Sequence, residues 1–429
     1  MKKKYRIILY TSIFLLCVVA SIILVVKKSN SVYEEESKPK VVKHKSMLSM
    51  NLEQTAGSGD YKTVTQSSWP TEGYKFNAEL SRCENGSTLS WDDTKKAVIV
   101  SGNLSDKCYV YFDIYQPTLA EYIKSQYTGT QGENSIYYHN SSLENGAGDN
   151  SYRYAGANPN NFVCFGSDAS PCPIDNLYRI IGVFGENYHG ANGKQLVKLI
   201  KYDYMTTDEL GTDGDYSQTY KEWGMDSTYK GTYGDGERIG VYYWNYKATG
   251  SATNTWSTSL LNKTNLNTNF INNIGTTWAN KIATVTWKVG GNTWANIGTK
   301  TSSVAYTNEI TNPVTTNTTD NATTYSAKIG LMYVSDYGFA ASPDAWTLTM
   351  SSYNNTTATN NNWMYMGLYE WTISRSADNS DYAFLVSYVG CVNNNLVNNY
   401  YGVRASFNLE SSVSYVSGSG SMSDPIVIN

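Results

Sequence analysis

The sequence predicts an α+β protein held outside the cell by an N-terminal transmembrane helix. Three observations support this: a long apolar run near the N-terminus, several β-type alternating runs between turn residues, and one strong helical pattern. The 429 residues are enough for two or three domains. Only 16% of residues are charged, whereas 37 tyrosines and 11 tryptophans make the body neutral and aromatic, which argues against disorder. Because the net charge is −4, we expect no nucleic-acid partner.

The N-terminus carries the localisation signal. Residues 7–26 form an apolar run about as long as the core of a bilayer is thick. Basic residues cluster immediately before this run, so the positive-inside rule places the N-terminus in the cytoplasm. We therefore expect residues 1–29 to be an uncleaved, single-pass signal anchor in the cell membrane. A long, cleaved signal peptide is the alternative, and both place the body outside the cell.

Changes in composition divide the rest of the chain. Residues 30–70 lack periodicity and mix charges of both signs, which predicts a flexible stalk. Residues 71–115 contain alternating apolar runs separated by the turn signals ENGS and SGN, which predicts a small β-unit of three or four strands. A connector with a helix and a disulfide loop is expected at 116–174. Residues 175–429 are then the larger C-terminal domain.

The cysteines fit an extracellular protein. There are six, one of them inside the apolar run, and an oxidising compartment permits disulfides. Sequence does not fix connectivity; the expected local pairs are Cys83 with Cys108 and Cys164 with Cys172. The first pair would staple a β-unit that is too short to bury a large core. Cys391 is left over, and we expect it to be a small, buried apolar residue.

Within the larger part, three local patterns predict secondary structure. Residues 118–127 fit a short amphipathic helix. The runs at 177–184 and 196–202 are strand-like, and the glycine and asparagine between them favour a hairpin. The best candidate for a longer helix has apolar residues at intervals of four, which are Phe270, Ile274, Trp278 and Ile282.

Motifs for chemistry are scarce. Asp213 with Asp215 and Asp235 with Glu237 are acid pairs that suit calcium, but neither stretch matches an EF-hand, and turn formation explains them equally well. The three histidines are scattered and there is no CxxC, so a zinc site is not expected. Nucleophile and phosphate-loop motifs are absent as well. We therefore expect no enzyme and no cofactor, with calcium as the open alternative.

Two short motifs carry a resemblance. GLYEWT at 367–372 and GVR at 402–404 resemble the GNVWEWT-type and GFR-type motifs of the formylglycine-generating-enzyme branch of the C-type lectin fold. The resemblance covers about residues 175–415 and implies a C-type-lectin-like domain. It implies structural roles for Glu370, Trp371 and Arg404, with the tryptophan as a core anchor and the arginine buried or half-buried and paired.

The chain departs from that branch where chemistry is concerned. The oxidases of the branch use a cysteine pair in this region, whereas only Cys391 is present here. The EPN, QPD and WND motifs of calcium-binding lectins do not occur. The resemblance therefore implies neither catalysis nor a calcium-dependent sugar site.

Nearly the whole chain also resembles a recurrent family of anchored bacterial surface proteins. The segments that carry this resemblance are CENGSTLSWDD with SDKCYVYFD, NLYRIIGVF with VKLIK, GLMYVSDYGFA, and the SGSGSMSDPIVIN ending. The family implies a surface location and supplies no activity. Relatives usually have proline after GVR, where this chain has Ala405.

The stretch CVNNNLVNNYYGVR, 391–404, carries the functional prediction. Asparagine disfavours strands and helices, so we expect a loop. This stretch resembles the variable segments in the proteins of diversity-generating retroelements. In those proteins, adenine-directed mutagenesis of this part of the fold converts asparagine codons into tyrosine, serine or aspartate codons. Tyrosine and asparagine are also the side chains that paratopes use, on loops held by a rigid scaffold. The expected ligand-binding residues are Asn379, Asp381, Tyr382, Tyr388, Asn393, Asn394, Asn395, Asn398, Asn399, Tyr400 and Tyr401.

The sequence therefore predicts a cell-surface recognition or adhesion protein that binds an extracellular protein or glycan through residues 376–401. We expect the side chains of that segment to cluster on one exposed face. One alternative is a structural envelope protein without a specific ligand. The other is a degenerate oxidase-like enzyme, which would need Cys391 exposed in a cleft beside a base or a second thiol.

Overall fold

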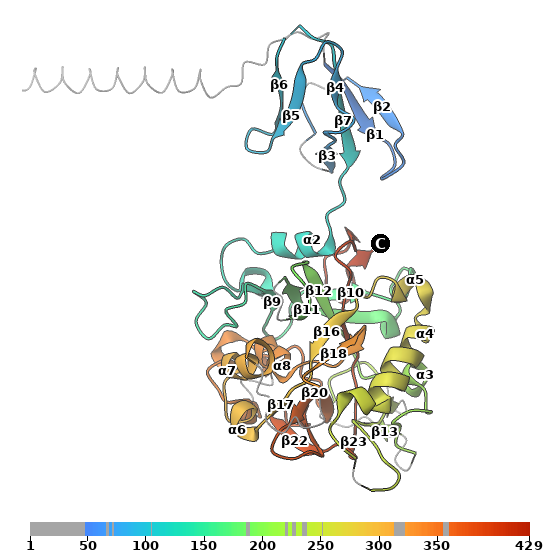
Figure 1. The fold of residues 1–429 in the computed structure, drawn as a ribbon, viewed down its shortest axis with the longest axis vertical. Helices are drawn as coiled ribbons and strands as arrows, with labels where there is room; N and C mark the ends of the chain where they lie inside the picture. Colours follow the sequence, from blue (N-terminus) through green and yellow to red (C-terminus); the bar gives the residue numbers. More distant parts are fainter. Residues whose placement is uncertain are drawn as a thin grey trace, which may run out of the picture. The chain divides into compact units, whose positions relative to one another are not determined.

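The computed structural model describes residues 48–429 except 66, 67, 71, 72, 104, 186–188, 219–221, 225–228, 234–237, 251, 313–321 and 355–359. The protein is a mixed α+β chain whose described residues form two compact units, divided between Tyr115 and Gln116 (Figure 1). The expected membrane segment at 7–26 lies outside the described residues. Among the residues that are described, no helix is both long enough and apolar enough to cross a bilayer.

The first unit is a five-stranded sheet with an added hairpin. Its strands are β1 (Leu48–Glu53), β2 (Tyr61–Val64), β3 (Tyr74–Phe76), β4 (Arg82–Cys83), β5 (Thr88–Asp92), β6 (Ala97–Ser101) and β7 (Cys108–Ile114). The order is β2-β1-β7-β3, β4 also pairs with β7, and β5 and β6 form the hairpin. Met50 and Leu52 on β1 pack against Val110 and Phe112 on β7. The predicted stalk is therefore wrong from Leu48 onward, because β1 completes this core.

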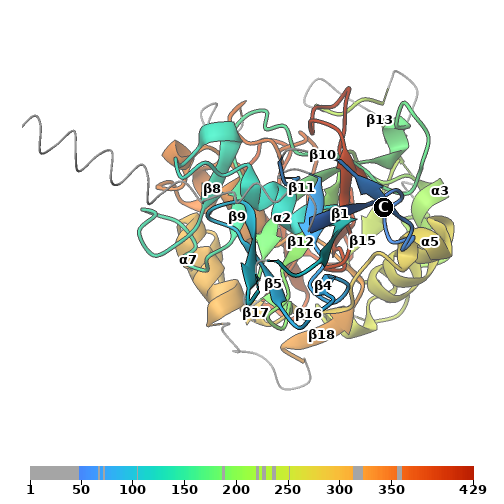
Figure 2. The same ribbon diagram turned by 90° about the horizontal axis from the view of Figure 1, so that it is seen from above.

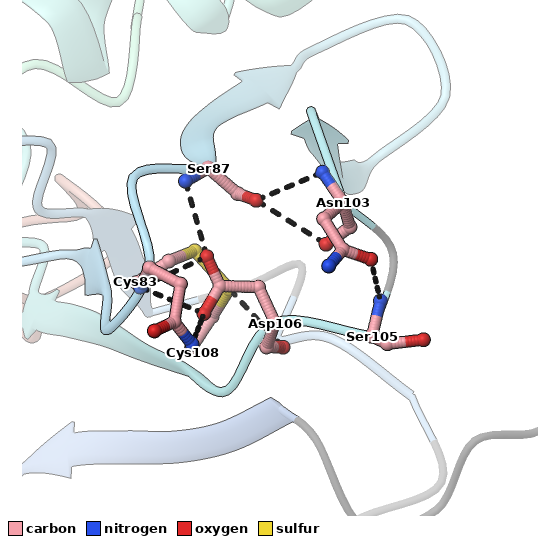
Figure 3. Close-up of a disulfide and its surroundings, with 7 residues drawn as sticks. Cys83, Ser87, Asn103, Ser105, Asp106 and Cys108 are labelled. Carbon is pink, nitrogen blue, oxygen red and sulfur yellow. Dashed lines mark hydrogen bonds between the residues drawn. A yellow bond between two sulfur atoms is a disulfide. The ribbon is translucent and has the colours of Figure 1, made fainter.

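The predicted disulfide between Cys83 and Cys108 is confirmed and joins β4 to β7. Next to it, the Asp106 carboxylate accepts hydrogen bonds from the backbone N–H groups of Asn85 at 2.9 Å and Ser87 at 3.1 Å (Figure 3). The bond and the carboxylate therefore fix the same end of the small unit.

The second unit contains two larger sheets. The first has seven strands, in the order β19-β24-β12-β11-β9-β8 with β10 beside β11. Its strands are β8 (Ile136–Tyr138), β9 (Tyr152–Tyr154), β10 (Phe162–Cys164), β11 (Leu177–Phe184), β12 (Leu196–Lys201), β19 (Ile329–Gly330) and β24 (Ser406–Asn408). The hairpin predicted at 177–184 and 196–202 is confirmed as β11 and β12. The disulfide between Cys164 and Cys172 is confirmed as well.

The second sheet has the order β17-β20-β21-β22. Its strands are β17 (Gly291–Asn292), β20 (Glu370–Ser376), β21 (Tyr382–Val386) and β22 (Val392–Leu396). The remaining strands pair as β13 (Glu222–Gly224) with β14 (Arg238–Gly240), β15 (Tyr242–Tyr243) with β23 (Tyr400–Tyr401), β16 (Val285–Lys288) with β18 (Thr324–Ala327), and β25 (Tyr415–Ser417) with β26 (Val427–Ile428).

Helices are short and flank the strands. Apart from single 3₁₀ turns, the helices in the described ranges are α2 (Leu119–Ser125), α3 (Thr207–Leu210), η5 (Leu261–Phe270), α4 (Ile271–Asn273), α5 (Gly275–Ala279), α6 (Trp294–Ile297), α7 (Ser302–Tyr306), η6 (Thr307–Thr311) and α8 (Val334–Ala340). In both views, α7 lies on one side of β11 and β12, and α3 with α5 lies on the other (Figures 1 and 2).

The helix predicted at 118–127 is confirmed as α2. Thr118 and Glu121 form a capping box at its start. Their side chains accept hydrogen bonds from backbone N–H groups that otherwise have no partner at a helix end. Leu119 and Ile123 are buried in the largest hydrophobic cluster of the second unit. The predicted boundary at residue 175 is therefore wrong: the connector at 116–174 belongs to the larger unit, because its helix helps to fill that core.

The longer predicted helix is divided into η5, α4 and α5. Gly275 has a φ of +76°, in the left-handed region that interrupts a helix. Phe270 and Trp278 are buried as their spacing predicts, but Ile282 lies beyond the end of α5 and forms a bridge with Leu409. The periodicity therefore predicts which side of this segment is buried, but it does not predict that the helix is interrupted.

Candidate ligand-binding face

The predicted binding segment contains a β-hairpin rather than a loop. Residues 393–395 lie in β22, where they pair with Leu385, Phe384 and Ala383 of β21. These three residues are buried, so their packing outweighs the low strand propensity of asparagine. The loop prediction is therefore wrong for β22 and for β23, and it holds for the turns between the strands.

The tip of this hairpin exposes two apolar side chains on a tight turn. The N–H of Gly390 donates to the carbonyl of Ser387 at 2.8 Å, and Gly390 has a φ of +92° that favours glycine. Between them, Tyr388 is 44% exposed and Val389 is 36% exposed. Tyr388 is thus the most exposed aromatic side chain of the predicted segment.

Two buried tyrosines form hydrogen bonds to the backbone of this tip. The hydroxyl of Tyr337 donates to the carbonyl of Gly390 at 2.6 Å, and the hydroxyl of Tyr365 donates to the carbonyl of Tyr388. Both supporting rings are buried; the hydrogen bond from Tyr337 is buried and the one from Tyr365 is partly buried, and both fix the backbone of the turn. The exposed ring of Tyr388 therefore stands on a rigid base.

A row of aromatic rings, here called the tyrosine row, leads from this tip into the core. It consists of Tyr388, Tyr369, Tyr401 and Trp371, with successive ring centroids 5.3, 5.0 and 4.7 Å apart. Trp371 is fully buried and its Nε1 donates to the carbonyl of Tyr242 at 2.9 Å. Burial raises the pKa of Tyr369 and Tyr401, so both remain neutral phenols near pH 7.

Asn395 contacts the tyrosine row, and Asn393 lies on the same strand. They lie two residues apart on β22 and therefore share one face of the strand, and the Nδ2 of Asn395 donates to the hydroxyl of Tyr401 at 2.7 Å. Their Oδ1 atoms accept from the N–H groups of Asn394 and Leu396, at 2.8 and 2.9 Å. Because β22 ends its sheet, these side chains cover backbone groups that an edge strand otherwise presents to another chain.

The predicted residues do not all share one face. Asn394 and Tyr382 point to the side opposite Asn393, because side chains alternate along a strand. The exposed members of the set are Asn379, Tyr388, Asn393 and Asn398; the half-buried ones are Asp381, Tyr382, Asn394, Asn395, Asn399 and Tyr400; Tyr401 is buried. The single-face expectation is thus wrong for the full set, of which Asn393 and Asn395 share one face of β22.

The sequence prediction missed several aromatic residues near this face. Tyr369 lies in the middle of the tyrosine row. Tyr243 pairs across strands with Tyr400, and its ring stacks on Tyr246 at 4.6 Å. Tyr246 is 46% exposed. The YYWNY run at 242–246 is the signal that could have identified the last two residues.

The motif residues Glu370 and Arg404 form a buried ion pair. Arg404 donates from Nε and Nη2 to the two carboxylate oxygens of Glu370, at 2.8 and 2.9 Å, and from Nη2 to the carbonyl of Met364 at 2.6 Å. Burial acts to lower the pKa of Arg404, but Glu370 raises it above its usual value. Burial raises the pKa of Glu370 although Arg404 opposes this. Glu370 and Arg404 are therefore both ionised, because a neutral Glu370 would leave a buried guanidinium without a counter-charge.

Cys391 is half-buried rather than part of the core, so that expectation is wrong. Its residue follows the exposed turn of the hairpin, and its Sγ lies 3.1 Å from the Oγ of Ser387. Every other cysteine in the described part of the chain is in a disulfide. The described residues therefore give Cys391 no second thiol.

Of the two acid pairs that suit calcium by sequence, only Asp213 and Asp215 lie within the described residues. Asp235 and Glu237 lie outside the described residues. The carboxylate of Asp215 accepts from the N–H groups of Leu260 and Leu261, at 3.0 and 3.2 Å, at the start of η5. Over the ranges that the structure describes, no group of three or more His, Cys, Asp or Glu side chains could hold a metal ion.

Asp215→Asn should change how stability depends on pH. Burial raises the pKa of Asp215 from 3.8 to about 6, so between these values the folded carboxyl keeps a proton that the unfolded chain releases. The free energy of unfolding should therefore fall as pH rises from about 4 to 6 and stay lower above it. The variant should lack this contribution, on the order of 2 kcal/mol, in urea titrations at pH 4, 5, 6 and 7. Parallel curves for the two proteins would contradict this assignment.

The face as a whole offers aromatic surface and amide groups on a fixed backbone. Such a surface suits non-covalent contact with a ligand, through ring packing and hydrogen bonds.

No family profile, no curated protein and no solved structure matches this chain.

Proposed function

We propose that the protein is an extracellular recognition or adhesion protein, anchored by residues 7–26, that binds a protein or glycan at the tyrosine row. The observation that carries this proposal is the exposed ring of Tyr388 on a turn fixed by Tyr337 and Tyr365. Asn395 adds an amide group that binds Tyr401 of the row, and Asn393 lies on the same face of β22.

Rigidity is the physical reason to expect binding there. A flexible loop loses conformational freedom when it binds, whereas a fixed turn has lost it already. A tyrosine side chain adds a large amphipathic surface with only two rotatable bonds, so it also loses little conformational entropy when it binds. The face combines both features with little net charge, which suits neutral ligands such as glycans or uncharged protein surfaces.

We also propose that the larger unit has the C-type-lectin-like, formylglycine-generating-enzyme-like fold. The residues of the two motifs support this, because Glu370 and Arg404 bind each other and Trp371 anchors the tyrosine row. The strand that follows GVR, β24, pairs with β12 of the central hairpin. Diversification by a retroelement is a genomic hypothesis: a near-copy of the codons for 376–404, differing at adenines, should lie beside a reverse transcriptase gene.

The binding proposal predicts that Tyr388→Ala abolishes or strongly weakens ligand binding. Residues 30–429 would be screened against a glycan array and a panel of purified extracellular proteins, and each hit measured by titration. An aromatic anchor at the centre of a face contributes about 2 kcal/mol or more, so the variant should lose at least about 30-fold in affinity.

Val416→Ala is the matched control. Val416 is 45% exposed on β25, which pairs with the C-terminal strand β26, and Figure 1 places the C-terminus at the opposite end of the unit from β22. This variant should keep full affinity, and both variants should unfold like the wild type. A ligand that binds Tyr388→Ala as well as the wild type, or no ligand at all, would contradict the proposal.

A further inference from the structure

A buried lysine and a buried aspartate meet in the interior of the larger unit. The Nζ of Lys198 on β12 lies 2.5 Å from the Oδ2 of Asp336 on α8, and both side chains are at most 2% exposed. Ordinary charge-assisted N–H···O contacts are about 2.7–2.9 Å long. The amine and the carboxyl group are thus at very close range, 138 residues apart in the chain.

The surroundings of this pair are aromatic and exclude water. The Nζ of Lys198 lies 4.5 Å from the ring centroid of Tyr333 and 5.2 Å from that of Trp287, and both rings are buried. Buried charges are costly unless they are paired or neutralised. This interior therefore favours any reaction that converts the ammonium and the carboxylate into neutral groups.

A third ionisable residue, Glu309, binds the first turn of α8, the helix that carries Asp336. Its two oxygens accept from the N–H groups of Val334 and Ser335, at 3.1 and 2.9 Å, while the Oδ2 of Asp336 accepts from the N–H of Tyr333 at 3.0 Å. The two carboxyl groups therefore share the first turn of α8. Glu309 also accepts a hydrogen bond from the hydroxyl of Ser374.

The charges nearby balance with or without the Lys198–Asp336 pair. Arg153 has its own partner, Asp149, with 2.7 Å between Nη2 and Oδ2. The Nη1 of Arg153 and the Oδ1 of Asp336 have no hydrogen-bond partner and lie 3.8 Å apart. Loss of the Lys198 and Asp336 charges together would thus leave a balanced Arg153–Asp149 pair and one uncharged acceptor facing Arg153.

The protonation states support such a reaction. Burial lowers the pKa of Lys198, which favours the nucleophilic free amine, although Asp336 opposes the shift. Burial raises the pKa of Glu309, which favours its protonated form. Burial acts to raise the pKa of Asp336 as well, but Lys198 and Arg153 lower it overall.

We propose that Lys198 and Asp336 join in an intramolecular isopeptide bond, with Glu309 as the residue that transfers protons. The Nζ–Cγ bond forms, the Cγ–Oδ2 bond breaks, and two protons move from the nitrogen to the departing oxygen, which leaves as water. An ammonium and a carboxylate thus become one amide and one water molecule, without an oxidant or cofactor. The bond would join β12 to α8, and it is independent of the proposed ligand.

Peptide mass spectrometry of the purified full chain tests this directly. After reduction and proteolysis, we expect a branched peptide that contains both Lys198 and Asp336 and is lighter than its two linear parts together by one water. Fragmentation should place the link between these two side chains. Quantitative recovery of both segments as separate linear peptides would overturn the proposal without any variant.

Variants then assign the roles. Lys198→Met should give only linear peptides, whereas Lys201→Met, a buried lysine on the same strand with its Nζ 3.3 Å from Glu209, should keep the branched peptide. Asp336→Asn should reach the same product mass by releasing ammonia. Glu309→Gln should slow or prevent the link; an unchanged yield of the link in this variant would overturn the role of Glu309.

Discussion

Glu370→Ala should destabilise the larger unit by about 3–5 kcal/mol, because it leaves the guanidinium of Arg404 buried without a counter-charge. Arg404 also donates to the carbonyl of Met364, so it bridges two segments that support the tyrosine row. Urea unfolding monitored by tryptophan fluorescence would measure the loss. The removal of one partner is costly mainly because of the charge that stays behind.

That reason predicts a partial rescue. In the double variant Glu370→Leu with Arg404→Met, no buried charge is left, so stability should recover relative to Glu370→Ala. Glu410→Ala serves as the control, because its ion pair with Lys194 is exposed and 3.9 Å long, and exposed pairs contribute about 0–1 kcal/mol. Equal losses in Glu370→Ala and Glu410→Ala would contradict this account of the pair.

Removal of the disulfide between Cys83 and Cys108 should unfold the first unit and spare the second. The bond closes a loop of 25 residues, for which chain entropy predicts about 3.5 kcal/mol. Among the described residues of this unit, the core that remains has four buried apolar residues besides the disulfide, grouped around Phe112. In the double variant Cys83→Ala with Cys108→Ala, hydrogen exchange in β1 to β7 should therefore become fast.

The second disulfide provides the comparison. Cys164 and Cys172 close a loop of eight residues, which corresponds to about 2.5 kcal/mol, and they lie in a unit with a far larger core. The double variant Cys164→Ala with Cys172→Ala should therefore stay folded, with a lower transition midpoint. Retained protection of β1 to β7 in the first variant would show that the small core suffices without its bond.

Local signals allowed the sequence to predict part of this fold. Helix α2 has its capping box and its apolar spacing within ten residues, and β11 and β12 are adjacent in the chain. Strand β1 was missed because its partner β7 lies about 60 residues away, and the run LSMNLE is too short to stand out from a polar segment. The interruption at Gly275 was missed because the apolar spacing continues through it.

The binding face was predictable in location but not in arrangement. Asparagine and tyrosine content drew attention to residues 376–401, whereas the strand character of Asn393 to Asn395 depends on buried neighbours in β21 that no local pattern reveals. The tyrosine row joins residues 369, 388 and 401, and ring contact between them depends on the tertiary fold. The roles of Glu370 and Arg404 came from their motifs, since neither shows its partner in the sequence.

The asparagine side chains that cover the edge of β22 limit which substitutions the segment tolerates. Serine, threonine or aspartate at 393 or 395 keeps an acceptor oxygen near the neighbouring N–H, whereas tyrosine or glycine removes it. A bare strand edge invites pairing between neighbouring copies of the chain. Asn394 points to the opposite side of β22, and among the described residues its side chain covers no N–H group of this edge. Variation at alternate positions of β22 therefore has unequal consequences for pairing between copies of the chain.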